Sequence, residues 1–204
     1  MTTHLLRTLL VAGIGLAWSS TLPAAEAPSG EAGKFKFSTC MGCHGVPGYT
    51  NVYPTYHVPR LGGQHPQYVI AALSAYKTGQ RSHETMKANA SNLSEQDMAD
   101  IAAFLASFDE SDPPAPVRGN PKAGQKKAEA CAACHGPDGN STDPNFPRLA
   151  GQYEDYLAKA LHDYKSGARK NPIMAGMAAP LSEQDIADLA AFFASRPKGL
   201  AGVR

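Results

Sequence analysis

The chain has 204 residues, which is long enough for one medium domain or two small ones. Its 19 Lys and Arg residues nearly balance its 18 Asp and Glu residues. This balance argues against nucleic acid as a partner, because binding a phosphate backbone requires a concentrated basic face.

The N-terminal segment has the pattern of an export signal. Arg7 precedes the apolar run from Leu9 to Trp18, and small residues follow from Pro23 to Ala27. The apolar run is shorter than the roughly 20 residues that a membrane-spanning helix needs, which disfavours an uncleaved anchor. We therefore expect a signal peptide at residues 1–25 and a soluble mature chain, since charged residues or prolines interrupt every later apolar stretch.

The rest of the sequence contains one unit twice. The segment Arg60-Leu61-Gly62-Gly63-Gln64 recurs as Arg148-Leu149-Ala150-Gly151-Gln152, and the same offset of 88 extends without a gap to Leu93-Ser94 and Leu181-Ser182. Upstream, Cys40 to Gly45 matches Cys131 to Gly136 at an offset of 91. The first copy therefore has three extra residues in a Tyr-rich loop, residues 46–58.

Each copy has helical patterns in the same order. A helix is expected to lead into each cysteine cluster, and a second to run from near Pro66 to Gly79, with its twin from about Tyr153 to Gly167. A third begins at Ser94, a natural N-cap, with its twin at Ser182. Strand-like alternation is absent from the sequence, so the predicted fold class is all-α.

Residues 109–121 have the composition of a linker, rich in Pro, Asp and Gly. We expect one domain at residues 26–110, a linker at 111–121 and a second domain at 122–204. Charge is divided unevenly along the chain: residues 26–112 carry 6 basic and 9 acidic side chains, whereas residues 113–204 carry 12 basic and 9 acidic ones.

The four cysteines occur in two C-x-x-C-H motifs, the attachment pattern of haem c. Two thiols three residues apart on a helical turn can add to the two vinyl groups of one haem, with the next residue's imidazole below the iron. A structural zinc site usually has its two cysteine pairs much closer together than the 91 residues seen here. A thioredoxin-like redox pair would need a βαβ unit, which the helical pattern of this chain lacks. We expect Cys40 and Cys43, then Cys131 and Cys134, to bind two haem c groups, with His44 and His135 as iron ligands.

The opposite face of each iron needs a ligand, and in electron carriers a methionine thioether often provides it. Met86 and Met174 are the pair that coincides under the repeat, 42 and 39 residues after the motif histidines. They are the predicted distal ligands. Met41 and Met98 fit packing positions better, and Met177 matches Asn89. The rival at the first iron is His83, whose counterpart is Asn171.

With these motifs, the chain resembles the cytochrome c4 family, which are dihaem class I cytochromes c. The resemblance covers nearly all of the mature chain and implies two tandem class I cytochrome c domains joined by a Pro-rich linker. It also implies that the carbonyls of Pro59 and Pro147 accept the Nδ1 hydrogens of the two histidines. Arg60 and Arg148 are then expected to pair with haem propionates.

An iron held by protein on both sides has no vacant position for a substrate, and no catalytic group is evident in the sequence. The resemblance implies a periplasmic one-electron carrier between a quinol-oxidising complex and a terminal oxidase, and not an enzyme. It leaves peripheral association with the membrane open. Two alternatives remain: a cytochrome subunit of a larger dehydrogenase, and a dihaem enzyme such as a peroxidase or a sulfur-compound oxidase.

Overall fold

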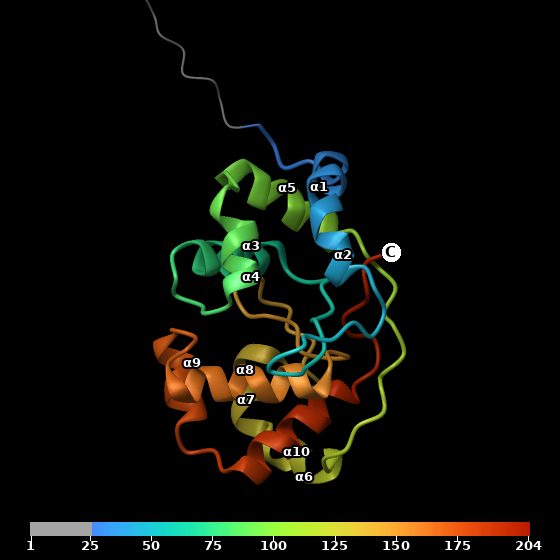
Figure 1. The fold of residues 1–204 in the computed structure, drawn as a ribbon. Coiled ribbons are helices and arrows are strands. Elements are labelled where there is room, and N and C mark those ends of the chain that lie inside the picture. The colour runs from blue at the N-terminus through green and yellow to red at the C-terminus, as the bar shows by residue number, and fades with distance from the viewer. Residues whose placement is uncertain (1–25) are drawn as a thin grey trace, which may run out of the picture.

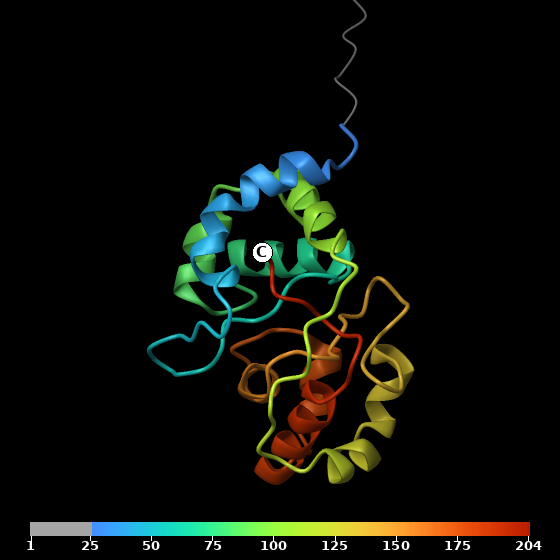
Figure 2. The ribbon, with the colours of Figure 1, turned by 90° about the vertical axis from the view of Figure 1, so that its right-hand side faces the viewer.

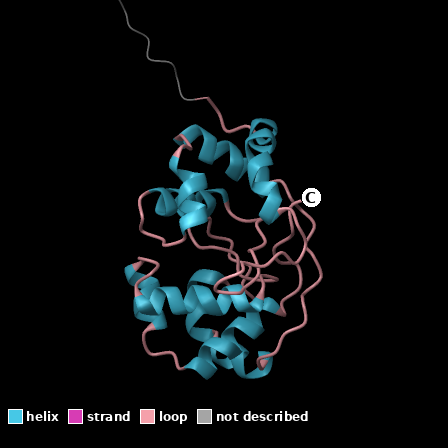
Figure 3. Cartoon of the chain, viewed as in Figure 1, coloured by secondary structure: helices cyan, strands magenta, loops and turns pink. Residues whose placement is uncertain are grey.

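The structure, a computed structural model, describes residues 26–204. The predicted signal peptide, residues 1–25, lies outside this part of the chain. The described residues form two helical halves stacked on one another, α1 to α5 in one and α6 to α10 in the other (Figure 1). Loops crowd the boundary between the halves (Figure 3). Across residues 26–204, no helix is long and apolar enough to cross a membrane.

The helices of the two halves follow the same order. The N-terminal half contains α1 (Gly30–Phe37), the 3₁₀ turn η1 (Ser38–Cys40), α2 (Met41–His44), α3 (Pro66–Lys77), α4 (Glu84–Ser91) and α5 (Glu95–Ala106). The C-terminal half contains α6 (Pro121–Lys127), α7 (Glu129–His135), α8 (Glu154–Ser166), α9 (Pro172–Ala178) and α10 (Glu183–Ala194). Three isolated β-bridges accompany them in the described residues.

The last helix of each half is fixed by a capping box. In α5, the Ser94 hydroxyl accepts from the Asp97 backbone N–H while the Asp97 carboxylate accepts from the Ser94 N–H. Ser182 and Asp185 do the same in α10. These caps satisfy backbone donors that a helix start leaves free, and such a cap contributes about 1 kcal/mol. The predicted starts of both helices are confirmed.

Helices α1 and α5 cross in close contact at Gly33. A Cβ on Gly33 would lie 1.9 Å from the Asp100 carbonyl oxygen, and a Cβ on Gly124 would lie 1.9 Å from the Asp188 carbonyl oxygen where α6 crosses α10. Any side chain at either glycine would therefore push the two helices apart. Beside each crossing lies a buried carboxylate that accepts from a lysine, Lys36 to Asp100 at 2.5 Å and Lys127 to Asp188 at 2.7 Å.

The C-terminal segment leaves its own half and ends against the other one. Figures 1 and 2 show it running from the end of α10 to the neighbourhood of α2. Gly62 and Ala201 exchange backbone hydrogen bonds of 2.9 and 3.0 Å. Val203 is 1% exposed and packs in the apolar cluster that contains Phe37 and Leu105. The last residues of the chain thus complete the core of the N-terminal half.

Candidate functional site

Each C-x-x-C-H motif lies in the helical turns that directly follow the first helix of its half. Cys40 ends η1, and Cys43 and His44 lie in α2, whereas the second motif lies wholly in α7. All four cysteine side chains are half-buried. Burial raises the pKa of the Cys40 and Cys131 thiols. The helical turn places both thiols of a pair on neighbouring positions, as thioether attachment at two points requires.

Both motif histidines make the hydrogen bond to a proline carbonyl that the resemblance implies. His44 Nδ1 lies 3.1 Å from the Pro59 carbonyl oxygen, and His135 Nδ1 lies 3.0 Å from that of Pro147. A carbonyl can only accept, so Nδ1 carries the proton and Nε2 keeps a free lone pair. Burial lowers the pKa of both imidazoles, which favours the neutral form that binds a metal.

The predicted distal methionines lie on matching short helices, Met86 on α4 and Met174 on α9. Each is half-buried. The residue three positions earlier caps the helix: the Met86 N–H donates to His83 Nδ1 at 3.2 Å, and the Met174 N–H donates to Asn171 Oδ1 at 3.0 Å. The second ring nitrogen of His83 lies 3.2 Å from the Asn51 amide nitrogen. The Nδ1 of His83 is therefore engaged as the helix cap, a role that Asn171 fills in the other half.

The start of α4 lies within electrostatic range of the first motif histidine. Burial has the largest effect on the pKa of His44 and lowers it, whereas the Pro59 bond raises it. The charges of His83 and Arg81 lower it further. In the other half, Arg169 lowers the pKa of His135 in the same way. Each half thus offers two thiols, an imidazole with a free Nε2 and a thioether on a short helix. This donor set fits haem c with His and Met ligands.

The repeated Arg-Leu-x-Gly-Gln segments join the two halves. The side-chain amide of Gln152 pairs with the backbone of Arg60, accepting at 2.9 Å and donating at 2.9 Å, and the amide of Gln64 pairs with Arg148 at 2.9 and 3.0 Å. Each amide satisfies a backbone N–H and a backbone carbonyl of the other half at once. The repeated glutamine therefore makes the same interface contact twice.

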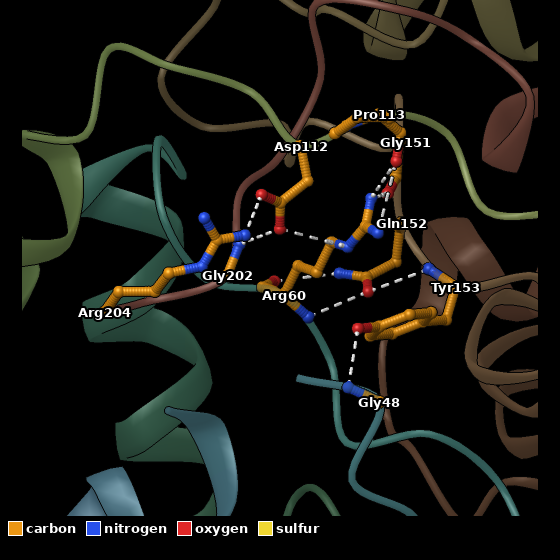
Figure 4. A network of polar contacts seen from close by, with 9 residues as sticks. All are labelled: Gly48, Arg60, Asp112, Pro113, Gly151, Gln152, Tyr153, Gly202 and Arg204. Carbon is orange, nitrogen blue, oxygen red and sulfur yellow. Dashed lines mark hydrogen bonds and ion pairs between the residues drawn. The ribbon is translucent and has the colours of Figure 1, made fainter. Parts of the chain in front are cut away.

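The guanidinium groups of the same segments also cross the interface. Arg60 donates to the Gly151 carbonyl at 2.7 Å, and its Nε lies 3.8 Å from a carboxylate oxygen of Asp112 (Figure 4). Arg148 donates to the Gly63 carbonyl at 3.0 Å. Both guanidiniums thus bind backbone carbonyls of the opposite half. Their pairing with haem propionates stays a prediction.

Sequence reasoning missed a second arginine pair, Arg81 and Arg169, which the offset of 88 also relates. Their backbones form an antiparallel bridge between the halves, and each side chain is 8% exposed. Arg169 donates to the Tyr68 hydroxyl at 2.6 Å, and Arg81 donates to the Tyr156 hydroxyl. Burial opposes ionisation of Tyr68, but the two guanidiniums outweigh it and lower its pKa to about 8.

Three other histidines have partners outside the motifs. His57 Nδ1 lies 2.7 Å from an Asp155 oxygen, and His65 Nε2 lies 2.8 Å from the Ser141 carbonyl oxygen. Both contacts join the two halves. His162 lies 3.4 Å from Glu183. These contacts give each of the three a structural role.

The sequence model of the cytochrome c family matches residues 30–109 and again residues 121–197. The chain belongs to the cytochrome c family. Each match contains one C-x-x-C-H motif, so the chain has two helical cytochrome c domains with two covalent haem c groups, one for each cysteine pair. The N-terminal and C-terminal halves are the first and second cytochrome c domains of the chain.

Relatives and a solved structure place the chain near cytochrome c4. Cytochrome c4 of Pseudomonas aeruginosa is 58% identical over 78 residues, a match that spans 38% of this chain and 39% of that protein. A thiosulfate dehydrogenase electron acceptor of Stutzerimonas stutzeri is 30% identical over 170 residues, covering 76% of this chain and 78% of that protein. The Acidithiobacillus ferrooxidans cytochrome c4 structure superimposes with a TM-score of 0.69 at 31% identity, covering 78% of this chain and 99% of that one.

Proposed function

We propose that the protein is a one-electron carrier of the periplasm, in which His44 and Met86 hold one haem iron and His135 and Met174 hold the other. When bound, each haem supplies a site that gains and loses one electron. The observation that carries the proposal is the pair of bonds from the motif histidines to Pro59 and Pro147, at 3.1 and 3.0 Å. Each bond fixes the imidazole with its Nε2 lone pair free for one iron position.

In this function the residues of the chain bind and orient the two haems, and none of them reacts with a substrate. Polar contacts between the domains, including the amide pairs of Gln64 and Gln152, hold the two haem-binding units together. With both positions of each iron filled by protein, substrate chemistry at iron is disfavoured and electron exchange remains. This argues for a carrier and against an enzyme such as a peroxidase.

The carrier's proposed position is between a quinol-oxidising complex and a terminal oxidase. An absorption spectrum of the purified ferric protein, with haem quantified per chain, tests the proposal. We expect two haems per chain and the near-infrared band of methionine bound to ferric iron. Fewer than two haems, or a high-spin spectrum showing an iron with an open position, would contradict it.

A second candidate function concerns the electron donor. One relative is named as the electron acceptor of a thiosulfate dehydrogenase and matches 76% of this chain. The test mixes the oxidised protein with the Stutzerimonas stutzeri thiosulfate dehydrogenase and thiosulfate. Haem reduction at a rate that saturates with protein concentration would support this donor, and reduction only at the rate seen without enzyme would exclude it. Co-purification of a catalytic subunit would instead favour a dehydrogenase subunit.

A further inference from the structure

A cavity lies beside the first C-x-x-C-H motif, at the bond between His44 and Pro59. Both partners of this bond line the cavity, and so do Gly202, Val203 and Arg204. These three residues come after the second cytochrome c domain, whose family match ends at residue 197. The C-terminal segment, which follows the second domain, therefore lies against the iron ligand of the first domain.

Polar contacts hold this part of the C-terminal segment in place. The backbone bridge between Gly62 and Ala201 ties it to the loop that follows Pro59. The Asp112 carboxylate accepts from the Gly202 N–H at 2.7 Å and from the Arg204 guanidinium at 2.5 Å (Figure 4). The position of the segment beside the cavity is thus fixed on both sides of Val203.

The Val203 side chain is the apolar member of this group. It is 1% exposed and belongs to the apolar cluster of the first domain, against which Cys40 and Leu61 also pack. Protein atoms alone produce this burial, and a haem bound at Cys40 could only add to it. Val203 therefore separates the cavity beside His44 from solvent with an apolar side chain that comes from outside the first domain.

The second domain meets the same need with a residue of its own. Phe146 directly precedes Pro147, and its ring lies edge-on to the ring of His135, at 6.3 Å between centroids. The matching residue of the first domain is the smaller Val58, which lines the cavity. Val203 thus occupies the neighbourhood that the shorter Val58 side chain leaves uncovered.

We infer that Val203 is a positioning residue for the first haem: it keeps water away from the bond between His44 and Pro59, and so raises the reduction potential of that haem. This rests on the proposed ligation of the first iron by His44. The bond from Nδ1 to a carbonyl sets the orientation of an iron-bound imidazole. Water beside it would compete for both the Nδ1 hydrogen and the carbonyl oxygen.

The direction of the effect on the potential follows from charge. The oxidised haem carries one more positive charge than the reduced haem, and water stabilises this charge better than an apolar side chain does. A water oxygen would accept the Nδ1 hydrogen in place of the Pro59 carbonyl, so the imidazole would keep a hydrogen-bond partner. Entry of water beside His44 should therefore lower the potential of the first haem.

The test uses the haem-loaded full chain labelled with ¹⁵N and reduced, a state in which NMR detects the Nδ1 proton of an iron-bound histidine. Val203→Ser places a polar group at the cavity, and we expect the His44 Nδ1 proton to exchange with solvent at least 10-fold faster. Val203→Ala, a milder change to the core, should give at least a 3-fold acceleration. The His135 Nδ1 proton should keep its wild-type rate in both variants.

The same variants should change the potential of one haem only. At a fixed solution potential, we expect the ratio of oxidised to reduced haem to rise at least 2-fold in the first domain and to stay unchanged in the second. Val69→Ala is the matched control, because it removes the same atoms as Val203→Ala from the same apolar cluster, at a side chain that is 6% exposed. Its His44 exchange rate and both potentials should equal those of the wild type.

The outcomes separate the inference from the proposed function. If the wild type shows no Nδ1 proton of an iron-bound histidine in the first domain, the ligation by His44 fails and the role of Val203 fails with it. If that proton is present, and either its exchange rate or the first potential is the same in both Val203 variants as in the wild type, the ligation stands and the inference is overturned. Equal changes in Val69→Ala would attribute the effect to a loosened core and would overturn it too.

Discussion

The guanidinium of Arg81 donates to the hydroxyl of Tyr156 across the boundary between the two cytochrome c domains. Arg169 returns the same contact to Tyr68 in the first domain. Each arginine also lies over a tyrosine ring of its own domain, Arg81 over Tyr76 and Arg169 over Tyr164, both at 4.5 Å. Two buried cations are therefore held by aromatic faces and hydroxyls at the centre of the interface.

The hydroxyls at this interface should measurably stabilise the protein. Tyr156→Phe and Tyr68→Phe each leave a buried guanidinium without one acceptor, and we expect each to lower the free energy of unfolding by about 1 to 3 kcal/mol. Guanidinium chloride unfolding of the haem-loaded protein measures this. Tyr53→Phe, at a 94% exposed position, is the control and should have no effect. Equal stability of all three variants would show that the interface bonds contribute nothing.

The distal methionines give the most direct test of the proposed haem sites. Met86→Ala and Met174→Ala should each remove half of the near-infrared band that marks methionine bound to ferric iron. Met177→Ala should leave the band intact. His83→Asn should also keep it, because Asn171 caps α9 in the same way that His83 caps α4. A wild-type protein with only half of the expected band, unchanged by Met86→Ala and removed by Met174→Ala, would contradict Met86 as a ligand and favour His83 at the first iron.

The C-terminal segment should stabilise the domain that it contacts. Val203 is 1% exposed within the core of the first domain, so Val203→Ala leaves a cavity and should cost on the order of 2 kcal/mol. Val52→Ala removes the same atoms at a 90% exposed position and should change stability little. Thermal unfolding of both variants provides the comparison. A result in which the two variants unfold alike would mean that the segment is not packed in solution.

Acid should destabilise both domains through the capping boxes. The bond from Lys36 and the bonds from Ser94 lower the pKa of Asp97, and Lys127 and Ser182 do the same for Asp185. The folded state therefore holds these carboxylates ionised below their ordinary pKa of 3.8. Their stabilisation is present above that pH and is lost as the pH falls below it.

Unfolding midpoints measured from pH 6 to pH 2 test this pH dependence. Asp97→Asn and Asp185→Asn should be less stable than the wild type at pH 6 and should lose less stability on acidification. Glu95→Gln, exposed on the same helix as Asp97, is the control and should follow the wild-type profile. Asn variants with the full acid sensitivity of the wild type would rule out these carboxylates as its cause.

The second haem should have the higher reduction potential. Oxidation adds a positive charge, and the excess of basic residues in residues 113–204 opposes this. A unit charge about 15 Å away in water contributes on the order of 0.3 kcal/mol. After screening by salt, the charge difference between residues 26–112 and 113–204 contributes about 0.5 kcal/mol, or roughly 20 mV. NMR titration of the two methionine methyl signals, assigned with the Met86 and Met174 variants, measures each potential; a first-domain potential equal or higher at low salt would contradict the prediction.

The sequence predicted what depends on local pattern and on the repeat. The starts of α5 and α10 follow from Ser94 and Ser182, and the resemblance anticipated the bonds of His44 and His135 to proline carbonyls. The helix caps involve residues close in sequence, and the histidine bonds follow from the C-x-x-C-H motif, the attachment pattern of haem c. The short helices α4 and α9 were not predicted, because seven or eight residues give too little periodicity to detect.

The interface could not be predicted from the sequence. Arg60 and Arg148 bind carbonyls of the opposite domain, about one domain length away in the chain. Nothing in local periodicity indicates which surface of one domain meets the other. The same holds for Val203, whose apolar character is visible in the sequence but whose partners lie in the first domain. One signal for the interface was present in the sequence: the offset of 88 relates Arg81 to Arg169, and an arginine kept in both copies indicates that both copies use it for the same contact.

Gln64 binds the backbone of Arg148, and Gln152 binds the backbone of Arg60 in the same way. This reciprocal pair of contacts has the form of an isologous interface, in which each partner gives the contact that it receives. Homodimers with twofold symmetry are built in this way. Each domain therefore carries a self-complementary face, and the linker between them raises the effective concentration of one face for the other. A single domain released from the chain would expose this face, and pairing of two identical copies would restore the same bonds.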